Sequence, residues 1–403
     1  MEQPVNNSPL PDLCADGHVL IVTGFYPPQP GGSSVIMRNL LSRFNPASYS
    51  IVTVETKGAV SIEGSEQAAI YPVMSSVSFS SRVDKKWRDW QLPLMVSRVV
   101  RIAQQVRPMV IVGVYPDYHF LYAARAAAKK LKIPWISYLH DTIVEALSHS
   151  HLAQRGAQLQ KEVFQEASST LVMSRGMADL YREKYHFSST PLEHSYLEPI
   201  PEHIPEAQAL RQAFWGGAIY SINARAVSRI ADATSKIDCT FLLATDTEAA
   251  TLERLGVRGD HLKQEFYSGR KEYLDALQRQ GILVLALDYP DESPIHEDEL
   301  STIFPTKTPE YLASGRPILV HCPEHYFMAR FIKENGCGLV VSERSVPALE
   351  EACRVLLENS QEVQEMGRCA LKAAHLFAAD RVASLFQDQV RKTAKVKWAE
   401  HIE

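Results

Sequence analysis

The chain has 403 residues, of which 45% are hydrophobic and 22% charged, so it has the composition of a folded globular protein and the length for two domains. Its formal net charge of −5 gives no bulk attraction to nucleic acid. The first residues lack the basic-then-apolar pattern of a signal peptide, and no apolar run approaches the roughly 20 residues of a membrane span, so we expect a cytoplasmic protein.

Short apolar runs alternate with helical periods along the first half of the chain. The expected strands cover 18–23, 49–54, 109–114, 134–138 and 169–173, and the expected helices cover 33–44, 118–131, 151–167 and 176–184. Such alternation predicts a mostly parallel, doubly wound sheet. Four prolines, at positions 191, 199, 201 and 205, then interrupt the pattern, so we place an N-terminal Rossmann-like domain at 1–197.

The alternation restarts after these prolines. We expect strands at 213–218, 239–244, 281–286, 317–321 and 337–341, and helices at 223–234, 271–279 and 325–334, before three closing helices. A second Rossmann-like domain is therefore predicted at 205–379, and the last helix, 380–403, is expected to pack back on the first domain. The predicted fold class is α/β, with two doubly wound domains facing across a cleft that binds ligands at the carboxyl ends of the strands.

Two glycines, Gly31 and Gly32, follow the first predicted strand at the start of a helix. Adjacent glycines at a helix start let backbone N–H groups approach an anion or a sugar closely. The alternative is a flexible turn in which Ser33 or Ser34 caps the helix.

The fourth predicted strand ends in Leu139-His140-Asp141, which places an imidazole and a carboxylate at the carboxyl edge of a parallel sheet. Catalytic residues gather at such edges, so His140 is a candidate catalytic residue. In the alternative interpretation Asp141 caps a helix and His140 fills space. His119 also follows a strand, where an aromatic-flanked histidine is more often structural.

A second glycine pair, Gly216 and Gly217, follows the first strand of the second domain, with Arg225 in the first turn of the next helix. A diphosphate could bind between these backbone amides and the guanidinium. An arginine at a helix start opposes the helix macrodipole, so Arg225 is expected to have a role other than stabilising the helix.

The segment from Phe304 to Val320 has the layout of a phosphate and sugar-hydroxyl clamp. Pro305 and Pro309 bracket a helix start, and Lys307 and Glu310 share one helical face. A charged pair at a helix start suits an anion with neighbouring hydroxyls.

Several motifs are absent. The sequence contains no Asp-x-Asp, no HExxH and no His, Asp or Glu set with metal spacing, so we expect no metal. A P-loop and the GxGxxG fingerprint are missing as well, and no cofactor is predicted.

Residues 81–107 mix basic residues with tryptophans and aliphatics, as segments that lie on an anionic membrane do. The alternative is an amphipathic helix packed on the sheet with its basic face in water. If the first interpretation holds, the protein is peripheral at the inner face of the membrane.

With both halves taken together, the chain resembles the retaining glycosyltransferases of the GT-B fold, most like glycosyltransferase family 4. The resemblance covers nearly the whole length and rests on four stretches: Tyr26-Pro-Pro-x-x-Gly31-Gly32, Leu139-His140-Asp141, Gly216-Gly217 and Pro305-x-Lys307-x-x-Glu310-Tyr311-Leu-Ala-Ser-Gly315-x-Pro317. It implies that the glycine loops lie against the donor phosphate and sugar, that His140 touches the donor sugar, and that Lys307 and Arg225 hold the diphosphate. Glu310 would bind the ribose hydroxyls.

Two positions depart from the family's pattern. A glutamate that usually contacts the donor sugar would fall at position 302, where this chain has Thr302, so either Thr302 or backbone amides stand in, or the donor differs, or activity is weakened. The usual asparagine-glycine loop after the first domain is replaced by His194-Ser-Tyr-Leu-Glu-Pro199.

The resemblance implies a metal-independent retaining hexosyltransferase of polysaccharide biosynthesis, which moves a sugar from a nucleotide-diphosphate donor to a saccharide or lipid-linked acceptor. Two alternatives stay open. One is a nucleotide-sugar 2-epimerase of the same architecture, and the other is a non-catalytic nucleotide-sugar-binding or scaffold protein of a glycan assembly pathway.

Overall fold

The computed structural model describes residues 10–15, 17–29, 31–55, 68–75, 82–205, 210–358 and 360–396. The chain divides into two compact units. Unit 1 comprises Met1–Met173, Met177–Ser195 and Ala379–Glu403, and unit 2 comprises Ser174–Gly176 and Tyr196–Ala378.

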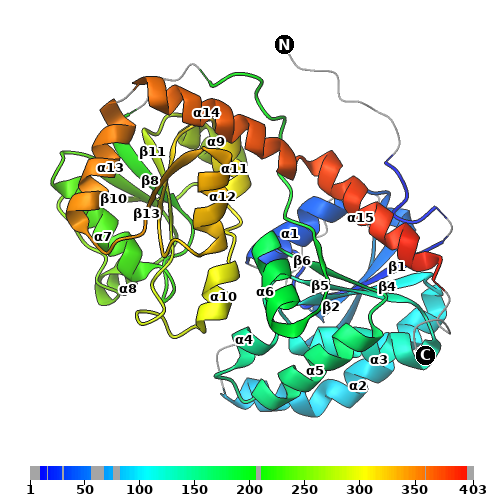
Figure 1. The fold of residues 1–403 in the computed structure, drawn as a ribbon. Coiled ribbons are helices and arrows are strands. Elements are labelled where there is room, and N and C mark those ends of the chain that lie inside the picture. The colour runs from blue at the N-terminus through cyan, green and yellow to red at the C-terminus, as the bar shows by residue number, and fades with distance from the viewer. Residues whose placement is uncertain are drawn as a thin grey trace. The chain divides into compact units, whose positions relative to one another are not determined.

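Unit 1 is built on a parallel sheet in the order β3-β2-β1-β4-β5-β6-β7 (Figure 1). Its strands are β1 (Val19–Val22), β2 (Tyr49–Glu55), β3 (Ala69–Ser75), β4 (Val110–Tyr115), β5 (Trp135–Leu139), β6 (Ser169–Val172) and β7 (Thr190–Pro191). The inner strands are continuous apolar runs because helices cover both faces of the sheet.

The helices of unit 1 lie on the two faces of this sheet. They are α1 (Gly32–Leu41), α2 (Arg82–Val106), α3 (Tyr118–Leu131), α4 (Val144–Leu147), α5 (Ala153–Glu166), α6 (Arg175–Tyr185) and α15 (Ala379–Ala394), with the short η1 (Pro46–Ser48). The first two residues of α6 are grouped with unit 2. The closing helix α15 packs through Phe386 and Val390 into the same core as Ile21 and Val112. Residues 397–403 of the predicted last helix lie outside the described residues.

Unit 2 repeats the arrangement with a six-stranded parallel sheet in the order β10-β9-β8-β11-β12-β13. Its strands are β8 (Gln212–Gly216), β9 (Thr240–Ala244), β10 (Leu262–Glu265), β11 (Ile282–Ala286), β12 (Ile318–His321) and β13 (Gly338–Val341). Its helices are α7 (Ala224–Ser235), α8 (Ala249–Arg254), α9 (Arg270–Gln278), α10 (Glu297–Thr302), α11 (Thr308–Ala313), α12 (Phe327–Asn335), α13 (Val346–Glu358) and α14 (Ser360–Ala374), followed by η2 (His375–Phe377).

Numbered from the first strand of each sheet, both orders begin 3-2-1-4-5-6, the doubly wound order of a Rossmann-like domain. In such sheets the strand order reverses between the first and fourth strands, and ligands bind outside the carboxyl ends there. That point lies between β1 and β4 in unit 1 and between β8 and β11 in unit 2. The predicted fold class of two Rossmann-like α/β domains is confirmed.

All the strands expected from the sequence are present, with ends shifted by one or two residues. Three edge strands, β3, β7 and β10, were not expected from the sequence, and β7 is only two residues long. β3 contains Pro72, and β10 reads Leu-Lys-Gln-Glu with three exposed residues, so neither shows the apolar run of a buried strand. Among the described residues no helix is long and apolar enough to cross a membrane.

Candidate functional site

The glycine pair after β8 is required by the backbone and by its neighbours. Gly217 has φ of +98°, which side-chain-bearing residues rarely adopt. A Cβ on Gly216 would lie 2.5 Å from the Tyr273 hydroxyl oxygen, so Gly216 allows a close approach of the strand end to α9.

Two side chains from the start of α11 hold the Gly216 peptide groups. Lys307 Nζ donates a hydrogen bond to the Gly216 carbonyl oxygen at 2.8 Å, and the Gly216 N–H donates to the Tyr311 hydroxyl oxygen at 2.8 Å. Lys307 and Tyr311 are four residues apart and therefore lie on the same helical face. The Lys-x-x-Glu-Tyr segment thus fixes the carboxyl end of β8 through both peptide groups of Gly216.

The indole of Trp215 completes this arrangement. Its Nε1–H donates to the Gly217 carbonyl oxygen at 2.9 Å, and Lys307 Nζ lies 3.0 Å from the centroid of its ring, a cation–π contact. We call Trp215, Lys307 and Tyr311, which fix Gly216 and Gly217, the glycine clamp. Burial lowers the pKa of Lys307 well below its usual value, and the nearby Glu310 carboxylate opposes this shift.

Glu310 follows Lys307 by three residues and belongs to an acidic and basic cluster. Its Oε1 accepts a hydrogen bond from Arg270 Nη1, and Arg270 also binds the Glu198 carboxylate through Nε at 2.7 Å and Nη2 at 2.9 Å. The Tyr273 phenol is also near the Glu310 carboxylate and lowers its pKa. Burial raises the pKa of Glu310, whereas Arg270 lowers it.

The hydroxyl of Thr302 is used within its own helix. Thr302 ends α10, is 6% exposed, and donates through Oγ1 to the Glu299 carbonyl oxygen at 2.9 Å. Its carbonyl oxygen accepts from Ser174 Oγ at 2.9 Å. The donor-binding role expected for Thr302 stays a prediction.

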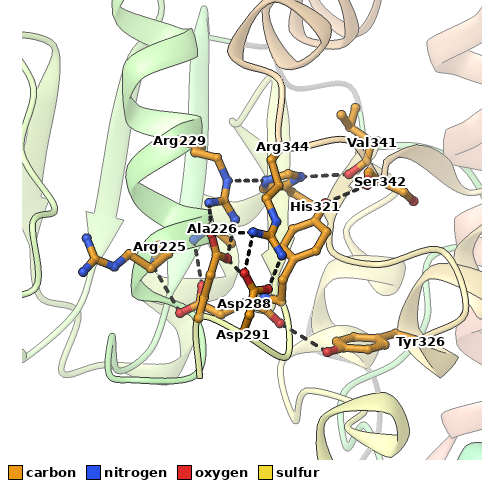
Figure 2. Close-up of polar contacts among 12 residues, drawn as sticks. Arg225, Ala226, Arg229, Asp288, Asp291, His321, Tyr326, Val341, Ser342 and Arg344 are labelled. Carbon is orange, nitrogen blue, oxygen red and sulfur yellow. Dashed lines mark hydrogen bonds and ion pairs between the residues drawn. The ribbon is translucent and has the colours of Figure 1, made fainter. Parts of the chain in front are cut away.

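The start of α7 is occupied by a carboxylate of the chain itself. Asp288, which follows β11, accepts hydrogen bonds from Ala226 N at 2.7 Å and from Arg225 N at 3.3 Å (Figure 2). Burial raises the pKa of Asp288 to about 6, against these two bonds. The first backbone amides of α7 therefore already hold a carboxylate of the chain.

The Arg225 side chain is exposed and points away from the Asp288 network in Figure 2. Its Nη1 lies 3.9 Å from the position that a Cβ would take on Gly256. The structure brings Lys307, Glu310, Gly216 and Gly217 together, whereas none of the contacts found among the described residues joins Arg225 to them. The paired action of Arg225 and Lys307 stays a prediction.

Beyond Asp288, an ion-pair network ties the ends of β11, β12 and β13 to α7. Arg229 pairs with Glu292, its Nε donates to His321 Nε2 at 2.9 Å, and His321 Nδ1 binds the Val341 carbonyl oxygen at 2.8 Å. Figure 2 shows Arg344 beside this network, where it pairs with Asp291. These bonds hold the carboxyl ends of β11, β12 and β13 against α7.

In unit 1, His140 directly follows β5 and is 8% exposed. Neither ring nitrogen has a hydrogen-bond partner within the described part of the chain, and the edge of the ring packs against Tyr138 with the centroids 4.4 Å apart. Burial lowers the pKa of His140 to about 3, with a smaller effect of His194. A neutral imidazole with two unused nitrogens is able to bind a hydroxyl.

Asp141 does not cap a helix, because α4 has Ile143 as its N-cap. Burial raises the pKa of Asp141 to about 6. His119 is held between two carboxylates, with Nε2 2.8 Å from Asp89 Oδ1 and Nδ1 3.7 Å from Asp117 Oδ1. These fixed contacts fit the structural role that we favoured for His119.

Gly31 and Gly32 are exposed at the start of α1. Gly31 is the N-cap, with φ of +114°, and has no side chain to cap the helix. Ser34, in the first turn, is 2% exposed, and its Oγ has no partner in the described ranges. In the described part of the chain no side chain caps the first N–H groups of α1, and Ser34 adds an unused hydroxyl; such groups at a helix start can bind an anion.

In unit 2 the sequence did not indicate the roles of Trp215, Arg270, Tyr273, Asp288 and the first-turn hydroxyl of Thr308. Asp288 left a signal, because it directly follows a buried strand at the carboxyl edge. Arg270 left none, because its partners lie 72 and 40 residues away in the chain.

Fold and site together define a protein with two Rossmann-like domains, whose strand ends carry one open and one clamped glycine loop. Residues 31–193 match the family described as "Glycosyl transferase 4-like domain". No curated protein matches the chain.

Solved structures match over almost the full length. Sucrose-phosphate synthase from Thermosynechococcus elongatus is 13% identical with a TM-score of 0.67, covering 93% of this chain and 98% of its own. Anabaena Alr3699/HepE in complex with UDP is 11% identical with a TM-score of 0.65, covering 93% and 99%. WaaG, a glycosyltransferase involved in lipopolysaccharide biosynthesis, is 14% identical with a TM-score of 0.61, covering 92% and 99%. The architecture is that of GT-B glycosyltransferases.

Proposed function

We propose that the protein is a retaining glycosyltransferase that transfers a sugar from a nucleotide-diphosphate donor to a saccharide or lipid-linked acceptor without a metal. The observation that carries this proposal is the glycine clamp, which fixes Gly216 and Gly217 beside the half-buried Glu310 at the switch point of a Rossmann-like sheet. Similarity of residues 31–193 to a glycosyltransferase domain supports the same activity. Two of the similar structures, of Alr3699/HepE, contain UDP and UDP-glucose.

In this proposal residues 205–379 form the donor-binding domain, and residues 1–197 with the helix at 380–403 form the acceptor-side domain. Glu310 accepts hydrogen bonds from ribose hydroxyls, since an ionised carboxylate is acceptor-only and retains free lone pairs beside Arg270. Lys307 and Arg225 offset charge on the leaving diphosphate, a preorganised electrostatic effect that takes the place of a cation. His140 and the start of α1 bind the sugar and its phosphate.

The first test is a thermal-shift screen of the wild-type protein against UDP, ADP, GDP and dTDP, followed by the matching nucleotide sugars. A ligand that binds only the folded state raises the melting temperature. Absence of any shift with all four nucleotides and their sugars would contradict the proposal.

The second test uses Lys307→Ala. Loss of one preorganised donor typically lowers turnover about 100-fold, so sugar transfer should fall by that order while the fold, followed by circular dichroism, persists. Lys271→Ala is the matched control, because Lys271 is an exposed lysine on α9 that binds only Asp275 in the described contacts. Near wild-type transfer by Lys307→Ala would refute the role of Lys307. Retention is read from the anomeric configuration of the product, and metal independence from transfer in excess chelator.

A non-catalytic nucleotide-sugar binder is the second candidate, and the engagement of the Thr302 hydroxyl within its own helix favours it. This candidate predicts the same thermal shifts but no transfer and no donor hydrolysis above background.

We also propose a peripheral contact of α2 with an anionic membrane at the inner face. Trp87 and Trp90 are 48% and 71% exposed and stack at 5.1 Å, and Leu94, one turn on, is 51% exposed. The helix carries six basic and two acidic residues. Exposed tryptophans with basic neighbours insert at lipid headgroups.

Co-sedimentation with vesicles that contain phosphatidylserine checks this contact. Trp87→Ala combined with Trp90→Ala should abolish pelleting, whereas Leu385→Ala, at a 42% exposed apolar side chain on α15, should not. Equal pelleting of the double variant and the wild type would rule the contact out.

A further inference from the structure

Arg270 is the first residue of α9, where a cationic side chain opposes the helix macrodipole. Its position is therefore not explained by helix stability. Instead, its guanidinium links two carboxylates from distant parts of unit 2. Nε and Nη2 bind Glu198 at 2.7 and 2.9 Å, and Nη1 binds Glu310.

Glu198 belongs to the segment that stands in place of the asparagine-glycine loop expected by resemblance. Tyr196, in the same segment, is 7% exposed, and its ring centroid lies 5.9 Å from the Arg270 guanidinium. The backbone here is fixed, because Tyr196 N donates to the Phe377 carbonyl oxygen at 2.8 Å. The unusual segment thus supplies a rigid brace for Arg270.

This brace determines where the remaining Arg270 nitrogen points. A bidentate arginine–carboxylate pair has a planar, fixed geometry. Because Nε and Nη2 are bound to Glu198, the orientation of the guanidinium is fixed, and its Nη1 points to Glu310. The Tyr273 phenol, also on α9, lies close enough to the same carboxylate to lower its pKa.

We infer that Arg270 is a positioning residue, which with its brace Glu198 keeps the Glu310 carboxylate oriented and ionised to accept hydrogen bonds from the ribose hydroxyls of the donor. The inference rests on the proposed function and adds to it a residue that neither the motif nor the resemblance contains. Glu310 retains acceptor capacity, because an ionised carboxylate offers about four lone-pair sites.

The electrostatics around Glu310 agree with this role. Burial raises the pKa of the carboxyl group and Arg270 is the main group that lowers it, whereas Glu198 raises it. Lys307 from α11 also faces Glu310, together with the phenols of Tyr273, Tyr311 and Tyr196. Without Arg270 the carboxyl group would become protonated at a higher pH and would then donate rather than accept.

The test compares binding of UDP, ADP, GDP and dTDP by calorimetry between pH 5 and 8, using the nucleotide that the wild-type protein binds most tightly. Arg270→Ala should weaken it about tenfold or more at neutral pH, the equivalent of a lost hydrogen bond to a charged group. The acid limb of its affinity profile should move to higher pH. Arg270→Lys should restore part of the affinity, and Lys271→Ala, the neighbouring exposed lysine, should change nothing.

Binding by Arg270→Ala within twofold of the wild type, with an unchanged pH profile, would overturn the inference. If the wild type itself binds no nucleotide, the proposed function fails, and a ligand-free measurement decides the inference separately. Carboxyl ¹³C NMR of glutamate-labelled protein, with the Glu310 signal assigned by Glu310→Gln, should show this carboxyl group titrating at higher pH in Arg270→Ala. An unchanged titration would again overturn it.

Discussion

The two glycine pairs occupy equivalent places, each after the first strand of a Rossmann-like sheet, yet their surroundings are opposite. Gly216 and Gly217 are fixed by Trp215, Lys307 and Tyr311, and the helix that follows them is capped by Asp288. Gly31 and Gly32 are exposed, and α1 begins without a side-chain cap.

The difference separates two ways in which glycine serves a binding site. In unit 2 the missing side chain lets the strand end approach Tyr273, so the loop offers a rigid shape and few free donors. In unit 1 no described atom lies within 4 Å of a Cβ on Gly31, which is also true of Gly217, but the helix that follows Gly31 has no side-chain cap. Unit 1 is therefore suited to receive an anion, and unit 2 to position Glu310 and Lys307.

The strongest way to break this contrast is Gly216→Ala. The new Cβ would meet the Tyr273 hydroxyl at 2.5 Å, so Tyr273 or the clamped loop must move. We expect a loss of about 3 kcal/mol in the free energy of unfolding, the upper range for overpacking. The matched variant Gly32→Ala adds its methyl group at an exposed helical position, where the change should be neutral or stabilising by up to about 1 kcal/mol. Urea denaturation of both variants measures this, and equal losses would contradict the contrast.

A second measurement tests unit 1 through the pH dependence of its stability, at His140. Burial lowers the folded-state pKa of His140 to about 3 from a usual 6.5, so between these values the unfolded chain binds the extra proton. Stability must then fall as pH falls, by about 2 kcal/mol between pH 7 and 5 from this group alone. His140→Leu removes the titrating group, so the unfolding free energy of the wild type minus that of the variant should fall by that amount between pH 7 and 5. A pH-independent difference would show that His140 is not buried as a neutral imidazole.

Periodicity and apolar runs predicted the architecture well because burial of parallel strands leaves a continuous local signal, as in β4 and β11. The Lys307 and Glu310 segment was also visible, since both residues lie within one helical turn. The groups that Lys307 and Glu310 contact could not be predicted from the sequence. The role of Lys307 in holding the Gly216 carbonyl depends on a contact 91 residues away, and local pattern carries no information about such pairing.

The prediction for Arg225 shows a second limit of reasoning from the sequence. Its place in the first turn of α7 suggested an anion contact, but the orientation of a long exposed side chain is set by neighbours that the sequence does not identify. The occupation of the helix start by Asp288 likewise depends on the register of β8 against β11, which pairs Ile282 with Ala213.

The smallest expected effect tests the open helix start directly. Ser34 Oγ and Thr308 Oγ1 are buried hydroxyls in the first turns of α1 and α11, and neither has a partner among the described residues. Removing a buried hydroxyl that makes no hydrogen bond is close to neutral or slightly stabilising, so Ser34→Ala and Thr308→Val should each lie within about 0.5 kcal/mol of wild type. If these two hydroxyls bind the donor, both variants should also have a lower affinity for the nucleotide sugar, measured by calorimetry. Because α1 retains its free N–H groups, Ser34→Ala should respond to the phosphate-bearing donor and not to the free sugar. Unchanged affinity in both variants, with unchanged stability, would mean that the open helix start serves no donor and that the contrast between the two loops is one of packing alone.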